Sequence, residues 1–148
     1  VELTAFVRPT TPVAVVPFAD TCAAPAIIPE AGGFFQGNTS NAQADYTAGC
    51  DFNGTGPGGA PDQILKLQLT QRSRVIFDMQ GSGYTTLLDV RTGDDCPGTE
   101  VPMACSVGAT AIRSYLDLTL DPATYWVQVD GFAGASGPWQ LDVRVVPP

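Results

Sequence analysis

The sequence of 148 residues contains no histidine, and this absence removes several kinds of catalysis. A Ser–His–Asp triad and a Cys–His pair both need an imidazole as their general base. Gly58-Gly59 is not followed by the Gly-Lys-Ser/Thr sequence of a phosphate-binding loop. A glycosidase needs two opposed carboxylates in a cleft, whereas the aspartates of this chain stand mostly in turn-like contexts. We therefore expect a protein that is not an enzyme and that needs no organic cofactor.

Residues typical of helices and of nucleic-acid-binding surfaces are scarce. Lys66 is the single lysine, and 16 glycines and 13 prolines interrupt the chain. Seven basic residues stand against 15 acidic ones, which gives a formal net charge of −8. This balance excludes the basic surface that nucleic acids and anionic lipids require. The composition instead predicts many short strands joined by turns.

Long apolar runs are also missing. No stretch approaches the ~20 apolar residues that a membrane-spanning helix needs, so we expect no membrane span. The chain begins VELTAFV without a basic segment before it. We interpret Val1 as lying near the N-terminus of a mature, exported protein.

The four cysteines are the strongest indication of the compartment. They form no Cys-x-x-Cys pair, which argues against a zinc site. Two structural disulfides are the better interpretation, and four cysteines allow three connectivities. We favour Cys22–Cys50 and Cys96–Cys105, because the second pair would close the Pro- and Gly-containing loop between those two residues. Disulfides persist outside the cytosol, so the sequence predicts a secreted or cell-surface protein.

Apolar and polar residues alternate with a period of two along much of the chain, as in half-buried strands of an antiparallel sheet. Turn-forming pairs such as Asn53-Gly54 and Asp121-Pro122 separate these runs. The count predicts an all-β, antiparallel β-sandwich of seven to nine strands. The clearest alternating runs are residues 65–69, 74–79, 116–120 and 139–145.

Several of these segments together carry a family resemblance. The most diagnostic are Ala123–Phe132 (ATYWVQVDGF) and Gly137–Val143 (GPWQLDV), preceded by Ala60–Leu67 (APDQILKL) and Thr86–Arg91 (TLLDVR). From about Asp20 onward the chain resembles the bacterial pre-peptidase C-terminal (PPC) domain and its relatives in secreted proteins. The resemblance implies a jelly-roll-like β-sandwich that serves as an accessory domain, and relatives that bind collagen, polysaccharide or calcium. Unlike the commonest arrangement of that family, we expect no catalytic domain to be attached.

Acidic residues in a Gly-rich stretch suggest a possible calcium site. Hard cations bind several carboxylate and carbonyl oxygens, and Asp45, Asp51, Asn53 and Asp62 lie close together in sequence. No EF-hand-type loop is present. The alternative is that these residues simply form turns.

The aromatic residues divide into two groups. Trp126 and Trp139 stand in alternating strands, and we expect them in the core. Tyr84, Tyr115 and Phe132 stand at turns or on the polar phase of strands, and we expect them to be exposed contact residues.

Residues 1–19 form an apolar arm that precedes the predicted sandwich of residues 20–148. Either the arm supplies a strand to its own sandwich, or it completes the sheet of a neighbouring subunit by strand addition. In the second case the contacts repeat and the subunits assemble into a fibre. The residues expected to make these contacts are Leu3, Ala5, Val7, Val13, Val15 and Phe18.

Two non-catalytic functions follow from these observations. The first is a structural subunit of an extracellular fibre or surface layer, which self-associates through the arm. The second is an accessory module that binds a polysaccharide or an extracellular protein through loops around Tyr84, Cys96–Cys105 and Phe132.

Overall fold

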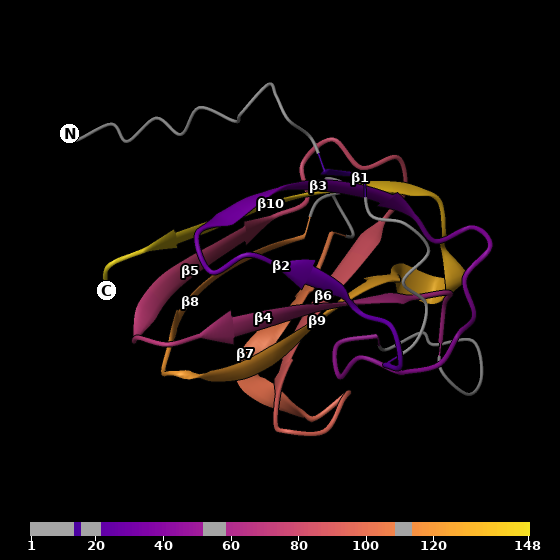
Figure 1. Cartoon of the computed structure of the whole chain (residues 1–148). Helices are drawn as coiled ribbons and strands as arrows, with labels where there is room; N and C mark the ends of the chain where they lie inside the picture. Colours follow the sequence, from indigo (N-terminus) through magenta and orange to yellow (C-terminus); the bar gives the residue numbers. More distant parts are fainter. Residues whose placement is uncertain (1–13, 16–21, 52–58, 109–113) are drawn as a thin grey trace.

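The computed structural model describes residues 14–15, 22–51, 59–108 and 114–148. Two five-stranded sheets stack face to face (Figure 1). Sheet A has the order β1 (Ala14–Val15), β3 (Gly32–Asn38), β10 (Pro138–Val146), β5 (Ser73–Asp78) and β8 (Tyr115–Leu120). Sheet B has the order β2 (Ala26–Ile28), β4 (Gln63–Leu69), β9 (Ala123–Gly131), β6 (Thr86–Thr92) and β7 (Thr99–Val107). A short 3₁₀ turn, η1 (Phe132–Gly134), joins β9 to β10.

The predicted fold class is confirmed, and the connections are those of a jelly roll. From β3 to β10 the chain visits the sheets in the order A, B, A, B, B, A, B, A, and apart from the β6–β7 hairpin the neighbours among these strands are distant in sequence. Only β1 and β2 pair in parallel, each with an inner neighbour. Apart from the two-residue β1, the described residues form nine strands, the upper end of the predicted range.

The core lies between the sheets and follows the predicted alternation. Val75, Phe77 and Met79 point inward from the region of β5, and Leu116 and Leu120 point inward from β8. Trp139 is 1% exposed, as expected. Its indole Nε1 donates a hydrogen bond of 2.7 Å to Gln63 Oε1, which joins β10 of sheet A to β4 of sheet B through the core.

The outer face of sheet B is buried as well. Ile64 and Leu87 point away from the core but are fully buried, and Trp126 on the same face is 5% exposed. The polypeptide between β3 and β4 covers this face, and we call its described residues, 39–51 and 59–62, the covering segment. The carbonyl of Tyr46 in this segment accepts a hydrogen bond of 2.9 Å from the side chain of Gln128 on β9.

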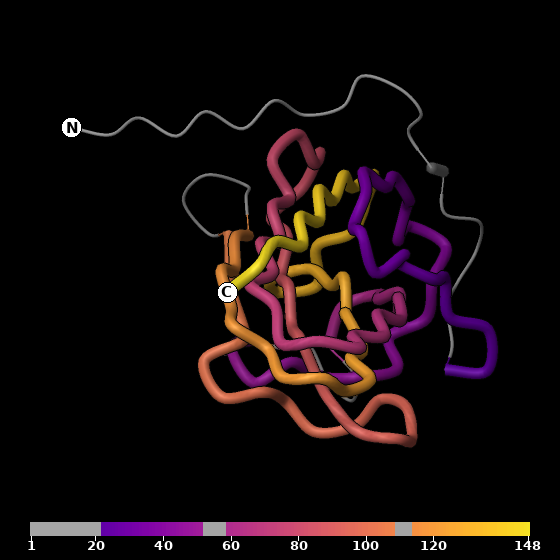
Figure 2. Tube along the Cα trace, turned by 60° about the vertical axis from the view of Figure 1, so that its left-hand side comes forward, coloured from indigo at the N-terminus to yellow at the C-terminus, as the bar shows by residue number. Residues whose placement is uncertain are grey.

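The disulfide pairing predicted from the sequence is wrong. The bonds join Cys22 to Cys96 and Cys50 to Cys105. Cys96 lies in the turn between β6 and β7, whereas Cys105 lies farther along β7, opposite Asp89. The two cysteines are thus separated along one hairpin, and each reaches instead to the chain that precedes β4. The hairpin turn lies at the edge of the molecule in both views (Figure 1 and Figure 2).

Only two residues of the predicted arm are described. Ala14 and Val15 form β1 and pair in parallel with Phe35 and Gln36 of the same chain. The other proposed contact residues of the arm (Leu3, Ala5, Val7, Val13 and Phe18) lie outside the described residues. No helix among the described residues is long and apolar enough to cross a bilayer.

Candidate metal centre

Polar side chains gather on the covered outer face of sheet B. On β9, Val127 and Val129 point into the core, so Gln128 and Asp130 between and after them point outward. Both are fully buried. Asp89 of β6, also fully buried, is the cross-strand neighbour of Gln128. The sheet therefore supplies three adjacent buried polar groups.

The covering segment adds Asp62 to this group. Its Oδ2 accepts backbone N–H hydrogen bonds from Asp45 at 3.1 Å and from Tyr46 at 2.9 Å. The side-chain amide of Gln128 lies 3.4 Å from the same oxygen and 3.1 Å from Asp130 Oδ2. Gln128 thus stands between the two carboxylates and holds both against the sheet.

Asp51 approaches from the other end of the covering segment and is 8% exposed. The backbone N–H of Ala133 lies 3.5 Å from Asp51 Oδ1, a long hydrogen bond. Ala133 has φ = 54°, a left-handed conformation that is uncommon for a residue with a side chain. The turn η1 thus adopts a strained backbone where it contacts this carboxylate.

Three buried oxygens of this cluster have no hydrogen-bond partner within the described part of the chain. They are Asp51 Oδ2, Asp89 Oδ1 and Gln128 Oε1. Leaving such a group unsatisfied costs about 1–3 kcal/mol, so a set of them in one place calls for a ligand or ordered water. Carboxylate and amide oxygens are the ligands that calcium prefers. These oxygens are of the kind that a hard cation binds, although the carboxylates of Asp51, Asp62 and Asp130 do not all lie within ligating distance of one another in this structure.

The pKa values of two carboxyl groups in the cluster are also raised by burial. Burial, together with the nearby carboxylates of Asp62, Asp51 and Asp89, raises the pKa of Asp130 to about 9, although the backbone N–H of Gly131 lowers it in part. Burial, together with Glu100, raises the pKa of Asp89 to about 7. Without a cation Asp130 retains its proton at neutral pH, and Asp89 is about half protonated. A bound divalent cation would replace the protons and allow the carboxylates to ionise.

One corner of the cluster already contains a positive charge. Arg91 Nη1 lies 3.0 Å from Asp89 Oδ2. Asp89, Glu100 and Cys105 lie close enough to suggest a second group of ligands. However, the Cys105 sulfur is bonded to Cys50 and cannot act as a thiolate. The candidate site proposed below is the remaining group, Asp51, Asp62, Gln128 and Asp130, whose carboxylates would have to move closer together to share one ion.

The sequence located half of these residues. Asp51 and Asp62 were predicted, and the structure brings both to the cluster. Asp45 is exposed and contributes its backbone N–H, and Asn53 lies outside the described residues. Gln128 and Asp130 were missed, although a signal existed. The outward positions of neighbouring strands carry the apolar residues Ile64 and Leu87, which indicates a covered face.

The aromatic predictions had mixed outcomes. Tyr84 is buried at 7% exposure and packs against Gly137, so its predicted role as an exposed contact is wrong. Tyr115 is 41% exposed, as predicted, and Phe132 is half-buried. The most exposed large apolar side chain described is Met103, at 93%, in the part of β7 where its register with β6 shifts.

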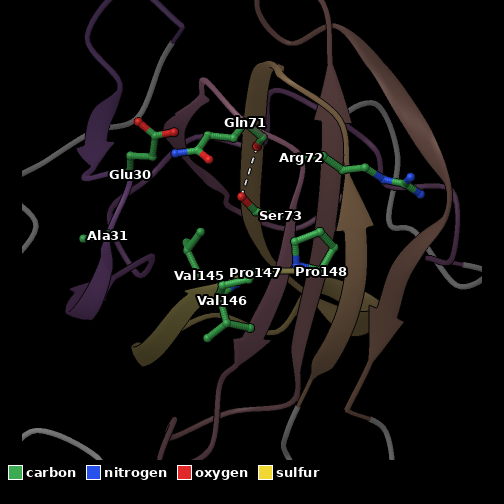
Figure 3. A pocket seen from close by; sticks show the side chains of 9 residues that line it. All are labelled: Glu30, Ala31, Gln71, Arg72, Ser73, Val145, Val146, Pro147 and Pro148. Carbon is green, nitrogen blue, oxygen red and sulfur yellow. Dashed lines mark hydrogen bonds between the residues drawn. The ribbon is translucent and has the colours of Figure 1, made fainter.

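A separate groove of about 470 Å³ opens where the ends of β3, β5 and β10 meet (Figure 3). Glu30 at its rim accepts hydrogen bonds from the backbone and hydroxyl of Thr70, and Ser73 donates to the Gln71 carbonyl. The side chain of Arg72 points away from the other lining residues (Figure 3). These polar groups are engaged with the protein itself, so we do not assign a ligand to this groove.

Comparison with known proteins supports the fold. No family model and no curated protein matches the chain. Among solved structures, the chain is similar to the pre-peptidase C-terminal domain of a collagenase from Bacillus anthracis, with a TM-score of 0.53 and 12% identity over 81% of this chain and 94% of that one. It also matches PliG, a periplasmic inhibitor of g-type lysozyme from Aeromonas hydrophila, with a TM-score of 0.45 and 12% identity over 90% of this chain and 99% of that one. The chain thus has a PPC-like fold, as its sequence resemblance implied.

Proposed function

We propose that this chain is a non-catalytic accessory module of an exported protein, and that a bound calcium ion locks its covering segment onto sheet B. The proposal rests chiefly on one observation: unsatisfied oxygens of Asp51 and Gln128 are buried beside Asp62 and Asp130. The two disulfides fit an oxidising compartment, either extracellular or periplasmic. Calcium is abundant enough outside cells to occupy sites of modest affinity.

The charge arrangement explains why a cation would matter. The covering segment brings Asp51 and Asp62 onto a face that already holds Asp130 and Asp89, so closing it gathers four carboxyl groups in a buried place, where Asp130 keeps its proton at neutral pH. The donors to Asp62 named above are neutral amides. A divalent cation would replace the proton and attract the carboxylates of both segment and sheet.

Thermal unfolding with calcium or with a chelator tests the proposal. At a free calcium concentration about 100 times Kd, binding to the folded state alone stabilises it by about 2.7 kcal/mol. Asp51→Asn and Asp130→Asn should reduce this response strongly. Asp94→Asn, at an exposed aspartate outside the cluster, is the matched control and should respond as the wild type does. A melting temperature that calcium leaves unchanged would overturn the proposal.

A more specific proposal concerns the partner that the module binds. We infer that it binds a polysaccharide or an extracellular protein through the chain between Cys96 and Cys105, where Met103 of β7 is almost fully exposed. Met103 also has φ = 62°, a strained conformation for a side-chain-bearing residue. Residues with strained backbone cluster at active sites and ligand-binding sites. Loss of binding in Met103→Asp with unchanged stability would support this assignment.

Self-assembly through residues 1–19 remains a prediction. The pairing of β1 with β3 of the same chain favours the simpler alternative, in which this part of the arm completes its own sheet. Light scattering of the full chain and of a chain lacking residues 1–19 distinguishes the two. High-mass particles that disappear on truncation would favour the fibre, and monomers in both samples would favour the accessory module.

A further inference from the structure

Met103 combines two features that the fold itself does not need. Its side chain is 93% exposed although it is apolar. Its backbone has φ = 62°, a left-handed conformation that is strained for a residue with a side chain. Glycine would relieve the strain, and a polar residue would suit the exposure. The packing of the domain explains neither feature, so the reason lies in what this side chain does at the surface.

The neighbouring residues of β7 hold Met103 at the surface. β7 is an edge strand, and its pairing with β6 is interrupted at residues 101–104, which form a bulge. Within this bulge, Ala104 is fully buried and Val101 packs against the core. The next residue, Cys105, is fixed by its disulfide. Because the bulge is anchored on both sides of Met103, the exposure of this side chain is a property of the fold.

Met103 also carries the one reduced sulfur of the chain that a small oxidant can reach. The chain has four cysteines and two methionines. All four cysteines are bonded in the two disulfides, so no thiol is free. The other methionine, Met79, is 0% exposed and lies in the core between the sheets. Oxidation is therefore directed to a single position.

We propose that Met103 is a site of reversible oxidation, at which a peroxide converts an apolar contact surface into a polar one while the domain stays folded. This inference rests on the recognition role of Met103 in the proposed function, and not on the calcium ion. It makes the oxidation state of one side chain the control of partner binding.

The reaction transfers one oxygen atom. The thioether sulfur of Met103 attacks hydrogen peroxide, the O–O bond breaks, an S–O bond forms and one water molecule leaves. The sulfur loses two electrons, and the peroxide gains them. The product, methionine sulfoxide, is polar and chiral. Methionine sulfoxide reductases return it to the thioether, with a dithiol as the electron donor and water as the second product.

Oxidation of Met103 changes the surface and leaves the core as it is. A side chain that is 93% exposed makes no buried contact for the sulfoxide to disrupt, so the melting temperature should stay unchanged. At the surface, a strongly hydrated group replaces an apolar one, and an apolar site on a partner would have to desolvate it. Oxidation of Met79 would have the opposite effect, since it would place a polar group in the core.

Limited treatment with hydrogen peroxide, followed by peptide mass spectrometry, tests the selectivity. We expect one added oxygen on Met103, at a rate close to that of N-acetylmethionine amide. Met79 should react about a thousandfold more slowly or less, because it is exposed only in the small unfolded fraction. The oxidised protein should keep its melting temperature, and reductases for both sulfoxide epimers should remove the oxygen. Comparable oxidation of both methionines, or an oxygen that the reductases cannot remove, would overturn the proposal.

Hydrophobic-interaction chromatography on a phenyl matrix tests the change of the surface. Met103→Leu keeps an apolar side chain that peroxide does not oxidise, and Met103→Gln has a polar side chain of similar length. The wild type and Met103→Leu should elute late, and the oxidised wild type and Met103→Gln early. If all four elute together, the recognition role of Met103 in the proposed function fails, and the switch with it. If Met103→Gln elutes early and the oxidised wild type late, only the oxidation inference fails.

Discussion

At the scale of single residues, buried polar groups carry most of the information about this protein. Asp130 is fully buried and carries a pKa of about 9. The carboxyl group of an acid at the surface is solvated by water and needs no such burial or raised pKa. Gly37 illustrates the opposite case of a residue selected by packing, because a Cβ there would overlap the indole of Trp139.

The pH dependence of the chelator-treated protein follows from Asp130. Its pKa rises from 3.8 to about 9 on folding, so between these values the folded state holds a proton that the unfolded state has lost. Stability should therefore fall as pH rises through this window, by up to about 1.4 kcal/mol per pH unit for one proton. Denaturant unfolding in chelator at pH 5 and pH 8 measures the difference. Asp130→Asn should show a smaller difference, and an equal one would contradict the assignment.

Gly37→Ala tests the packing against Trp139. Overpacking of this kind typically costs about 1–3 kcal/mol, and we expect a loss in that range by denaturant unfolding. The double variant Gly37→Ala/Trp139→Phe should lose less than the sum of the two single variants, because the smaller ring makes room for the methyl group. Additive losses would show that the two positions do not interact.

At the scale of elements, the β6–β7 hairpin connects the fold to the site. Arg91 of β6 donates to the carbonyls of Pro97 and Gly98 at 3.0 and 3.1 Å, and also pairs with Asp89. One guanidinium thus fixes the hairpin turn and compensates a buried carboxylate. The same hairpin carries Cys96 and Cys105, which attach the preceding chain.

Arg91→Lys should therefore destabilise the fold, although it keeps the positive charge. A lysine ammonium cannot reproduce the planar set of donors that reaches both carbonyls and Asp89 at once. We expect a loss of about 1–3 kcal/mol in the free energy of unfolding. Arg74→Lys is the matched control, because Arg74 pairs with Asp117 on an exposed part of sheet A and such pairs contribute about 0–1 kcal/mol. Similar losses in both variants would argue against this role of Arg91 in fixing the hairpin turn.

At the scale of the whole molecule, the sequence was informative about the inward face of each sheet and carried only a weak signal, Ile64 and Leu87, of the covered outer face of sheet B. The alternation in residues 65–69 and 74–79 predicted strands whose inward side chains do form the core. The burial of Gln128, Asp89 and Asp130 was not predictable in this way, because it depends on a covering segment from elsewhere in the chain. The disulfide pairing failed for the same reason. Proximity in sequence favoured Cys96–Cys105, whereas contact is decided by which segment lies over which strand.

The covering of sheet B has a further consequence for β9. This strand is paired with β4 and β6, and its residues from Tyr125 to Gly131 are all buried. Its amide hydrogens are therefore shielded from solvent on both faces and both edges, and they should exchange with deuterium only when the whole domain unfolds. Amides of the edge strand β8 should exchange by local opening. The free energy of exchange along β9 would then report global stability, so deuterium uptake in this one strand can follow the effect of calcium on the entire fold.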